Sequence, residues 1–170
     1  FGHIGRVSGS LPCFTNMADF DSILGILCIL TESFRLNFNK VPFVMIAAKH
    51  GNPCGLAVAW ESPEKVVDSC LFGNPKAVWG GEVIVNFPVT ESIAEQLFFS
   101  AKRENLHGSA YWMLDLVVAP EFDDKAVQVL GKRKERKLLT NPHLSLPHVN
   151  CSDWVKRPVR GGYLRQRPND

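Results

Sequence analysis

The sequence predicts an α/β fold, a single domain in which helices cover both faces of a central β-sheet to give three α-β-α layers. Segments typical of buried strands alternate along the chain with segments of helical period. The 170 residues suffice for one domain with a core of its own. The composition, 45% hydrophobic and 21% charged, is that of an ordinary globular protein.

The N-terminal part of the chain predicts a loop followed by a long helix with one buried face. Residues 1–15 are rich in glycine and read as loop, with room for one short strand. Asn16 or Asp19 caps a helix that runs to about Asn37. Its apolar residues recur at intervals of three and four, the helical spacing: Phe20, Ile23, Leu24, Leu27, Leu30 and Phe34.

A buried strand and a constrained loop come next. Residues 43–48 form an uninterrupted apolar run, which is typical of a strand covered on both faces. Residues 49–55 (KHGNPCG) contain two glycines and a proline and predict a turn or loop. A second strand is predicted at 57–59. Ser62 then caps a helix that ends near Gly73, with a proline at its first position.

The rest of the chain continues the alternation. Residues 78–86 predict a strand interrupted by two glycines, a sign of a bulge or of a closely approaching ligand. Helices are predicted at about 90–105 and 123–133, with a buried strand at 114–119 between them. From Asn141 onward the chain is rich in proline and glycine and predicts an extended arm.

These elements divide the single domain into three stretches. The predicted N-terminal loop takes about residues 1–15, the core takes 16–140, and the extended arm takes 141–170.

Charge and cysteine content narrow the functional class. A net charge of +2 gives no electrostatic case for binding nucleic acid. The five cysteines are irregularly spaced without a CxxC pair, so neither a disulfide framework nor a zinc site is indicated. No uninterrupted apolar run approaches the roughly 20 residues that span a bilayer. We therefore expect a cytoplasmic protein that binds no metal, nucleic acid or membrane.

Lys49 and His50 are the strongest candidates for chemistry. Taken singly, a lysine at a strand end is usually solvated and a histidine is usually structural. Together they follow a buried strand and enter a loop that glycine and proline hold in a fixed shape. Partial burial would lower the pKa of the lysine and place that of the histidine near neutrality. Such a pair can add one proton and remove another near neutral pH.

The segment KHGNPCG with the following Leu-Ala-Val closely resembles the KHxNPCGxA signature of AICAR transformylases. That domain belongs to the bifunctional purine-biosynthesis enzyme that also carries IMP cyclohydrolase activity. Further resemblances occur in the family's order, from about residue 7 to residue 170, and correspond to the first half of the tandem transformylase region. They lie at 14–19 (FTNMAD), 78–86 (VWGGEVIVN), 115–120 (DLVVAP), 126–139 and 159–166 (VRGGYLRQ).

The resemblance implies a cytidine-deaminase-like three-layer fold without the deaminase zinc. It implies transfer of a formyl group from 10-formyltetrahydrofolate to the 5-amino group of AICAR. By this resemblance His50 serves as the general base that takes the proton of the amine. Lys49 stabilises the developing oxyanion or assists proton delivery. One preorganised charge of this kind contributes about 3–4 kcal/mol to lowering the barrier.

Four further residues are assigned to substrate binding by the same resemblance. Asn16 and Asp115 would hydrogen-bond the nucleobase or ribose side. Trp79, where phenylalanine is usual in the family, would stack on the substrate's ring or line the side of its pocket. The backbone of Gly80 would lie close to this ring. Structural alternatives stay open: Asn16 as a helix cap, Asp115 as a surface residue, and Trp79 as part of the core.

Several family features fall outside these residues. They are an arginine segment for the nucleotide phosphate, the second tandem half with its folate-site asparagine, and the cyclohydrolase domain. The family's site also forms between chains of a dimer, so a homo-oligomer or a second transformylase-like domain is an expected partner. The chain, which opens on Phe1, is then a fragment, a stand-alone formyltransferase completed by oligomerisation, or a binding or scaffold subunit.

Lys49 and His50 favour the first two of these hypotheses, because a scaffold needs neither residue. Trp79 and the unmatched arginine segment leave open an acceptor amine other than AICAR. A zinc deaminase on the same fold would need a PCxxC pattern, which the sequence lacks.

Overall fold

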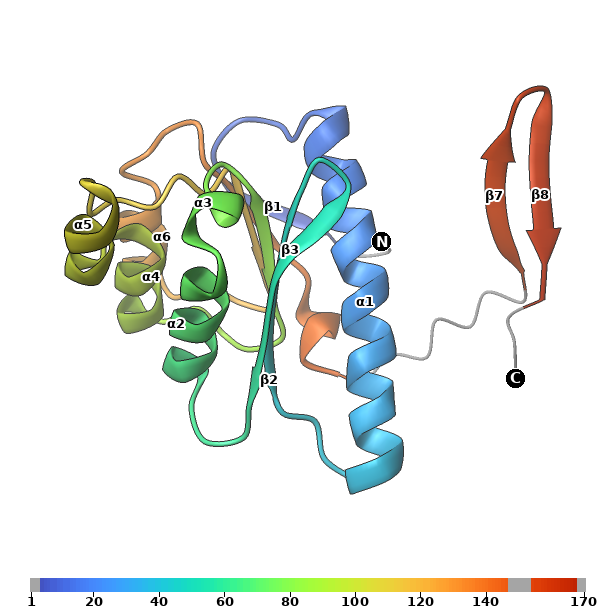
Figure 1. Cartoon of the computed structure of the whole chain (residues 1–170), viewed down its shortest axis with the longest axis horizontal. Helices are drawn as coiled ribbons and strands as arrows, with labels where there is room; N and C mark the ends of the chain where they lie inside the picture. The colour runs from blue at the N-terminus through green and yellow to red at the C-terminus, as the bar shows by residue number, and fades with distance from the viewer. Residues whose placement is uncertain (1–3, 147–153, 168–170) are drawn as a thin grey trace.

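The computed structural model describes residues 4–146 and 154–167, and within them helices cover both faces of a six-stranded sheet (Figure 1). The predicted three-layer α/β fold is confirmed. The strands of this sheet are β1 (Gly5–Ser8), β2 (Phe43–Lys49), β3 (Asn52–Ala59), β4 (Glu82–Val85), β5 (Leu116–Ala119) and β6 (Lys137–Thr140). The helices are α1 (Phe14–Phe38), α2 (Pro63–Gly73), α3 (Pro75–Val78), α4 (Glu91–Phe98), α5 (Ala101–His107), α6 (Asp124–Leu130) and the 3₁₀ turn η1 (Pro142–Ser145).

The sheet is mixed, and its strand directions decide where the site lies. Its order is β1-β6-β5-β4-β2-β3. Strand β2 runs antiparallel to β3 and β4, whereas β4, β5 and β6 run parallel to one another. The carboxyl end of β2 therefore meets the amino ends of β4 and β5 at one edge of the sheet. Lys49 ends β2 at this edge, and Glu82 begins β4 beside it.

Strand β2 is apolar from Phe43 to Ala48 because both of its faces are covered. Met45 and Ala47 face the layer that contains α2, α4 and α6, while Val44, Ile46 and Ala48 face α1. Successive side chains of a strand point to opposite faces, so a strand between two helical layers needs apolar residues at every position. All five of these side chains are fully buried.

Helix α1 packs on the second face of the sheet through residues such as Phe20, Ile23 and Leu27. By length and composition alone it could also cross a membrane, and 33% of the relevant window is buried. Core helices of globular proteins pass the same test, and the buried face of α1 includes the polar residues Asn16 and Asp19. We therefore describe α1 as a core helix.

The predicted loop at residues 49–55 is wrong over most of its length. Strand β3 begins at Asn52, and only His50 and Gly51 form the turn of a β2–β3 hairpin, both with positive φ. A bulge between Ala47 and Ala48 shifts the register of this hairpin. The prolines and glycines suggested a loop, but they are tolerated here because β3 is an edge strand.

Two other predicted elements have different limits. Only the second part of the strand predicted at 78–86 is a strand: Val78 ends helix α3, a turn with two glycines follows, and β4 begins at Glu82. A Cβ added to Gly81 would lie 2.5 Å from the carbonyl oxygen of Ala48, so the second glycine permits close backbone approach. The helix predicted at 90–105 is split into α4 and α5, because Phe99 leaves the helix to form a bridge with Tyr111.

The predicted cap of α2 provides a test of local stability. The hydroxyl of Ser62 accepts the backbone N–H of Lys65 at 3.2 Å. We expect Ser62→Ala to lower the free energy of unfolding by about 1 kcal/mol, because an amide at the helix start loses its partner. Urea denaturation measures this change. The control is Ser69→Ala, at an exposed position of the same helix, and an equal loss there would contradict the prediction.

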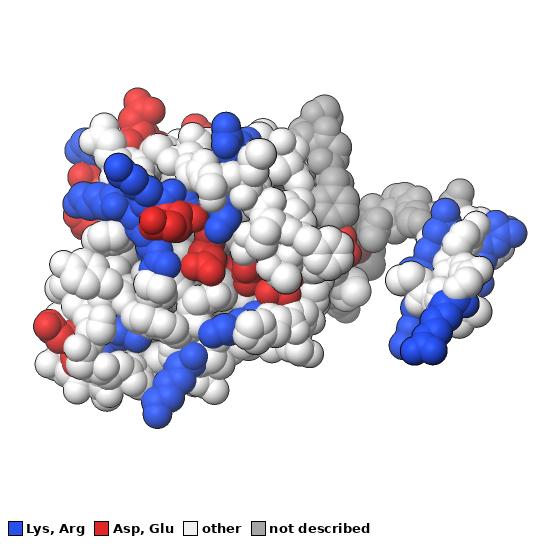
Figure 2. Space-filling view, turned by 90° about the horizontal axis from the view of Figure 1, so that it is seen from above, with Lys and Arg blue, Asp and Glu red and all other residues white. Residues whose placement is uncertain are grey.

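The predicted arm includes an antiparallel hairpin of β7 (Val155–Val159) and β8 (Gly162–Gln166). All residues from 154 to 167 are exposed, and five of them are Lys or Arg with no Asp or Glu, as the blue atoms of this hairpin in Figure 2 show. A two-stranded hairpin is marginally stable alone in water. Residues 147–153 of the predicted arm, including Cys151, lie outside the described residues.

Candidate functional site

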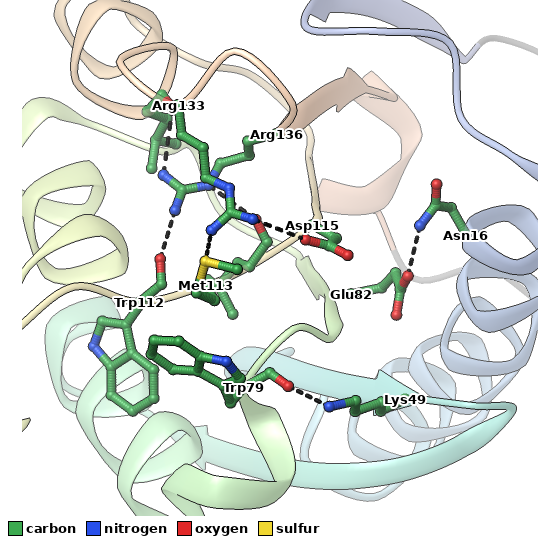
Figure 3. A network of polar contacts seen from close by, with 11 residues as sticks. Asn16, Lys49, Trp79, Glu82, Trp112, Met113, Asp115, Arg133 and Arg136 are labelled. Atoms are coloured by element: carbon green, nitrogen blue, oxygen red, sulfur yellow. Dashed lines mark hydrogen bonds and ion pairs between the residues drawn. The ribbon is translucent and has the colours of Figure 1, made fainter. Parts of the chain in front are cut away.

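Lys49 is held at the edge of the sheet by a backbone oxygen. Its ammonium group donates to the carbonyl oxygen of Trp79 at 2.5 Å (Figure 3). A Cβ added to Gly80 would lie 3.6 Å from Lys49 Nζ, and the φ of +75° at Gly80 suits glycine. The ammonium is thus fixed by a neutral acceptor, and its positive charge stays available to an anion.

His50 lies on a turn that Asp19 fixes from helix α1. The backbone N–H of His50 donates to Asp19 Oδ2 at 3.0 Å, and the N–H of Gly51 donates to Asp19 Oδ1. Hydrogen bonds from amides to a carboxylate are stronger than neutral ones. They stabilise the φ of +56° at His50, which is unfavourable for a non-glycine residue. The exposed His50 side chain is therefore carried on a fixed backbone.

Asn16 is buried and uses both ends of its amide within the protein. Its Oδ1 accepts the backbone N–H of Cys13 at 3.1 Å, in a capping box at the start of α1. Its Nδ2 donates to Glu82 Oε1 at 2.7 Å. The predicted cap is wrong in position, because Cys13 is the N-cap and Asn16 contributes to the capping box as the third helical residue. Asn16 also links α1 to the first residue of β4. Its contact with a substrate stays a prediction.

Glu82 is a buried acid with an altered protonation equilibrium. Burial raises its pKa from 4.5 to about 7. The hydrogen bond from Asn16 acts in the opposite direction, whereas Asp19 raises the pKa as acceptor for the protonated form and as a like charge. Asp115 adds a smaller repulsion. Glu82 Oε2 is buried and has no hydrogen-bond partner among the described residues.

Asp115 lies at the same edge, directly before β5. Its backbone N–H donates to the carbonyl of Gly81 at 3.0 Å, which ties it to the turn before β4. Its carboxylate lies 3.6 Å from the guanidinium of Arg133, and its side chain is 40% exposed. Figure 2, seen from the top of Figure 1, shows acidic and basic side chains gathered on this face.

The indole of Trp79 does not lie beside Lys49. It points toward Trp112, on the other side of its own backbone (Figure 3). The guanidinium carbon of Arg103 lies 4.0 Å from its ring centroid, so one ring face is already covered. Trp79 reaches the Lys49 side of the site through its carbonyl oxygen, and the stacking role of its ring stays a prediction.

The structure brings Lys49, Asn16, Gly80 and Asp115 to one edge, with the His50 turn beside them. The residues that connect them, Asp19, Glu82 and Arg133, were not predicted as site residues from the sequence, where Asp19 was only a possible helix cap. Two of these left a signal: Asp19 stands on the buried stripe of α1, three residues after Asn16, and Glu82 is a lone charge before an apolar strand. Within residues 4–146 and 154–167, no three His, Cys, Asp or Glu side chains group as metal ligands would.

Comparisons with known proteins agree on one family. The family described as AICARFT/IMPCHase bienzyme matches residues 2–170. The bifunctional purine biosynthesis protein PurH of Prochlorococcus marinus (strain NATL1A) is 34% identical over 162 residues, which are 95% of this chain and 28% of that protein. PurH of Staphylococcus saprophyticus is 34% identical over 161 residues, 95% of this chain and 27% of that protein. PurH of Staphylococcus carnosus is 30% identical with the same coverage.

The chain thus spans little more than a quarter of the length of these curated relatives. The match nevertheless covers nearly all of the chain, including the edge of the sheet described above. The chain belongs to the AICARFT/IMPCHase bienzyme family.

Proposed function

We propose that this chain forms the first half of an AICAR transformylase, which moves a formyl group from 10-formyltetrahydrofolate to the 5-amino group of AICAR. One observation carries the proposal beyond family membership. The Lys49 ammonium and the His50 turn are held at one edge of the sheet, by the Trp79 carbonyl and by Asp19 respectively. Both contacts fix positions without neutralising the lysine.

The proposed step needs a base and a positive charge. The acceptor amine is conjugated to the imidazole ring and is a poor nucleophile, so a base must remove a proton as it attacks the formyl carbon. His50 takes that proton while the new C–N bond forms. Lys49 stabilises the oxyanion of the tetrahedral intermediate. The bond to the folate N10 then breaks, and N10 leaves with the proton that His50 took from the amine.

A second transformylase half or another copy of the chain would complete the site. The matched relatives extend far beyond the region that this chain covers. The exposed β7–β8 hairpin is a surface that could pack on such a partner, because two strands alone bury little. We further propose that the chain acts in the cytoplasm as a single transformylase-like domain, that folate is its formyl donor, and that the chemistry uses no metal.

A second candidate is a formyltransferase for a different amine, or a binding or scaffold subunit that keeps the fold. Two contacts favour it. The Asn16 amide is occupied by Cys13 and Glu82, and one face of the Trp79 ring is occupied by Arg103. AICAR would have to displace these contacts or be recognised by other groups.

Formyl transfer measured with and without the second half tests the proposal. We expect turnover of 10-formyltetrahydrofolate with AICAR when the chain is joined to the second transformylase half of a relative, and little turnover by the chain alone. Transfer to another amine but not to AICAR would support the second candidate's enzyme form. No transfer to any amine by the joined protein, with its fold intact by circular dichroism, would contradict both enzymatic readings.

A further inference from the structure

We propose that Glu82 is a positioning residue, which acts through Asp19 on the turn that carries His50. Only its consequence for catalysis rests on the proposed function. The structural part depends on a cluster of buried polar groups between β4, α1 and the β2–β3 turn. Glu82 pairs in the sheet with Ala48, the residue before Lys49, and so lies directly beneath the candidate site.

A chain of contacts leads from Glu82 to the turn. Oε1 of Glu82 accepts from the Asn16 amide, and Asp19 follows Asn16 by one helical turn on the same buried face of α1. Both carboxylate oxygens of Asp19 accept backbone N–H groups, from His50 and from Gly51. Glu82 therefore holds the first turn of α1, and α1 holds the turn of the hairpin.

The contacts assign the proton of this pair to Glu82. A like charge nearby disfavours the ionisation of a buried carboxyl group. Both oxygens of Asp19 already accept backbone N–H groups, whereas Glu82 Oε2 is buried without a hydrogen-bond partner among the described residues. A proton on Oε2 lets Glu82 donate to Asp19, and burial together with Asp19 raises the pKa of Glu82 to about 7.

Other charged or titratable groups face the same space from neighbouring elements. Asp115, before β5, raises the pKa of Glu82 further, and Arg133 lies beside Asp115. Lys49 at the end of β2, Glu82 and Asp19 all act electrostatically on the Cys54 thiol of β3. Burial raises the pKa of that thiol, so Cys54 is neutral over the pH range in question.

The direction of the pH effect follows from the raised pKa. The folded protein keeps the Glu82 proton above pH 4.5, where the unfolded chain loses it. The bridge to Asp19 is therefore complete at low pH and is lost as pH rises through about 7. Above that pH the two carboxylates repel each other, and the turn that carries His50 loosens.

Amide hydrogen exchange at Gly51, measured by NMR on the whole chain, tests this inference. After correction for the intrinsic exchange rate, we expect the protection of this amide to fall at least about tenfold between about pH 5.5 and about pH 8. In Glu82→Gln, the amide accepts from Asn16 and donates to Asp19 without ionising, so the protection should not depend on pH.

Two further variants complete the experiment. Glu82→Leu removes the bridge and should lower the protection of Gly51 at both pH values. Glu121→Gln changes an exposed acid and should behave as the parent. A Glu82→Gln protein with the parent's pH dependence would overturn the inference, and this result stays informative even if Glu82→Leu does not fold.

The exchange experiment needs no substrate, so its outcome is separable from that of the formyl-transfer assay. A pH-dependent turn in a protein without transfer would leave Glu82's role standing and remove the proposed function. If the protein transfers the formyl group but the protection of the Gly51 amide does not depend on pH, the proposed function stands and the role of Glu82 is removed.

Discussion

Lys49→Met is expected to lower the turnover number of formyl transfer by about 100- to 1000-fold, as loss of one oxyanion-stabilising group does in other acyl transfers. Methionine keeps much of the length and apolar stem of lysine but carries no charge. The Trp79 carbonyl, which the ammonium contacts at 2.5 Å, would lose only a donor at the edge of the sheet. Folding should therefore change little.

The measurement is the turnover number at saturating folate and AICAR, in the protein joined to its second half. Lys76→Met is the matched control, because Lys76 is an exposed lysine on α3, close in sequence to Trp79. We expect the control to keep the parent rate. Equal rates in Lys49→Met and the parent would remove Lys49 from the chemistry, and His50→Ala applies the same test to the proposed base.

Arg136→Ala is expected to lower the free energy of unfolding by about 3–5 kcal/mol, the range found for large buried side chains and broken buried networks. Arg136 is 1% exposed. It donates to the carbonyl oxygens of Trp112 at 2.8 Å and Leu114 at 3.0 Å. Alanine would leave a cavity and two buried acceptors without partners, each costing about 1–3 kcal/mol.

Burial lowers the pKa of Arg136 to about 10, with a smaller contribution from Arg133. The charged group is therefore retained at a cost, which its hydrogen bonds offset. Because the bonded segment leads directly to Asp115, the variant should also disturb that side of the site. Urea unfolding followed by fluorescence measures the loss. Lys134→Ala, an exposed neighbour, is the control, and a similar loss in both would contradict this account.

The sequence predicted the arrangement of layers better than the limits of the elements. Alternation of helical and strand-like segments reflects which faces are buried, so the three layers followed from it directly. The limits failed where backbone packing overrode local preference. Residues 52–55 are strand despite their proline and glycine because β2 offers a partner. Gly81 precedes β4 because only a glycine can approach the Ala48 carbonyl there.

For the candidate site, too, the sequence predicted the residues but not their arrangement in space. Lys49, His50, Asn16 and Asp115 were found as residues from motifs. Their shared edge followed only from the antiparallel direction of β2, which no local pattern encodes.

By itself the sequence determined the class of fold, the family and the side chains available for chemistry, since these depend on residue type and order. Tertiary structure alone decided that Asp19 holds the His50 turn, that burial raises the pKa of Glu82 and that the Trp79 ring points away from Lys49. The reason is physical. Hydrogen bonding and desolvation depend on neighbours brought from distant parts of the chain, and those neighbours exist only after strands and helices have packed.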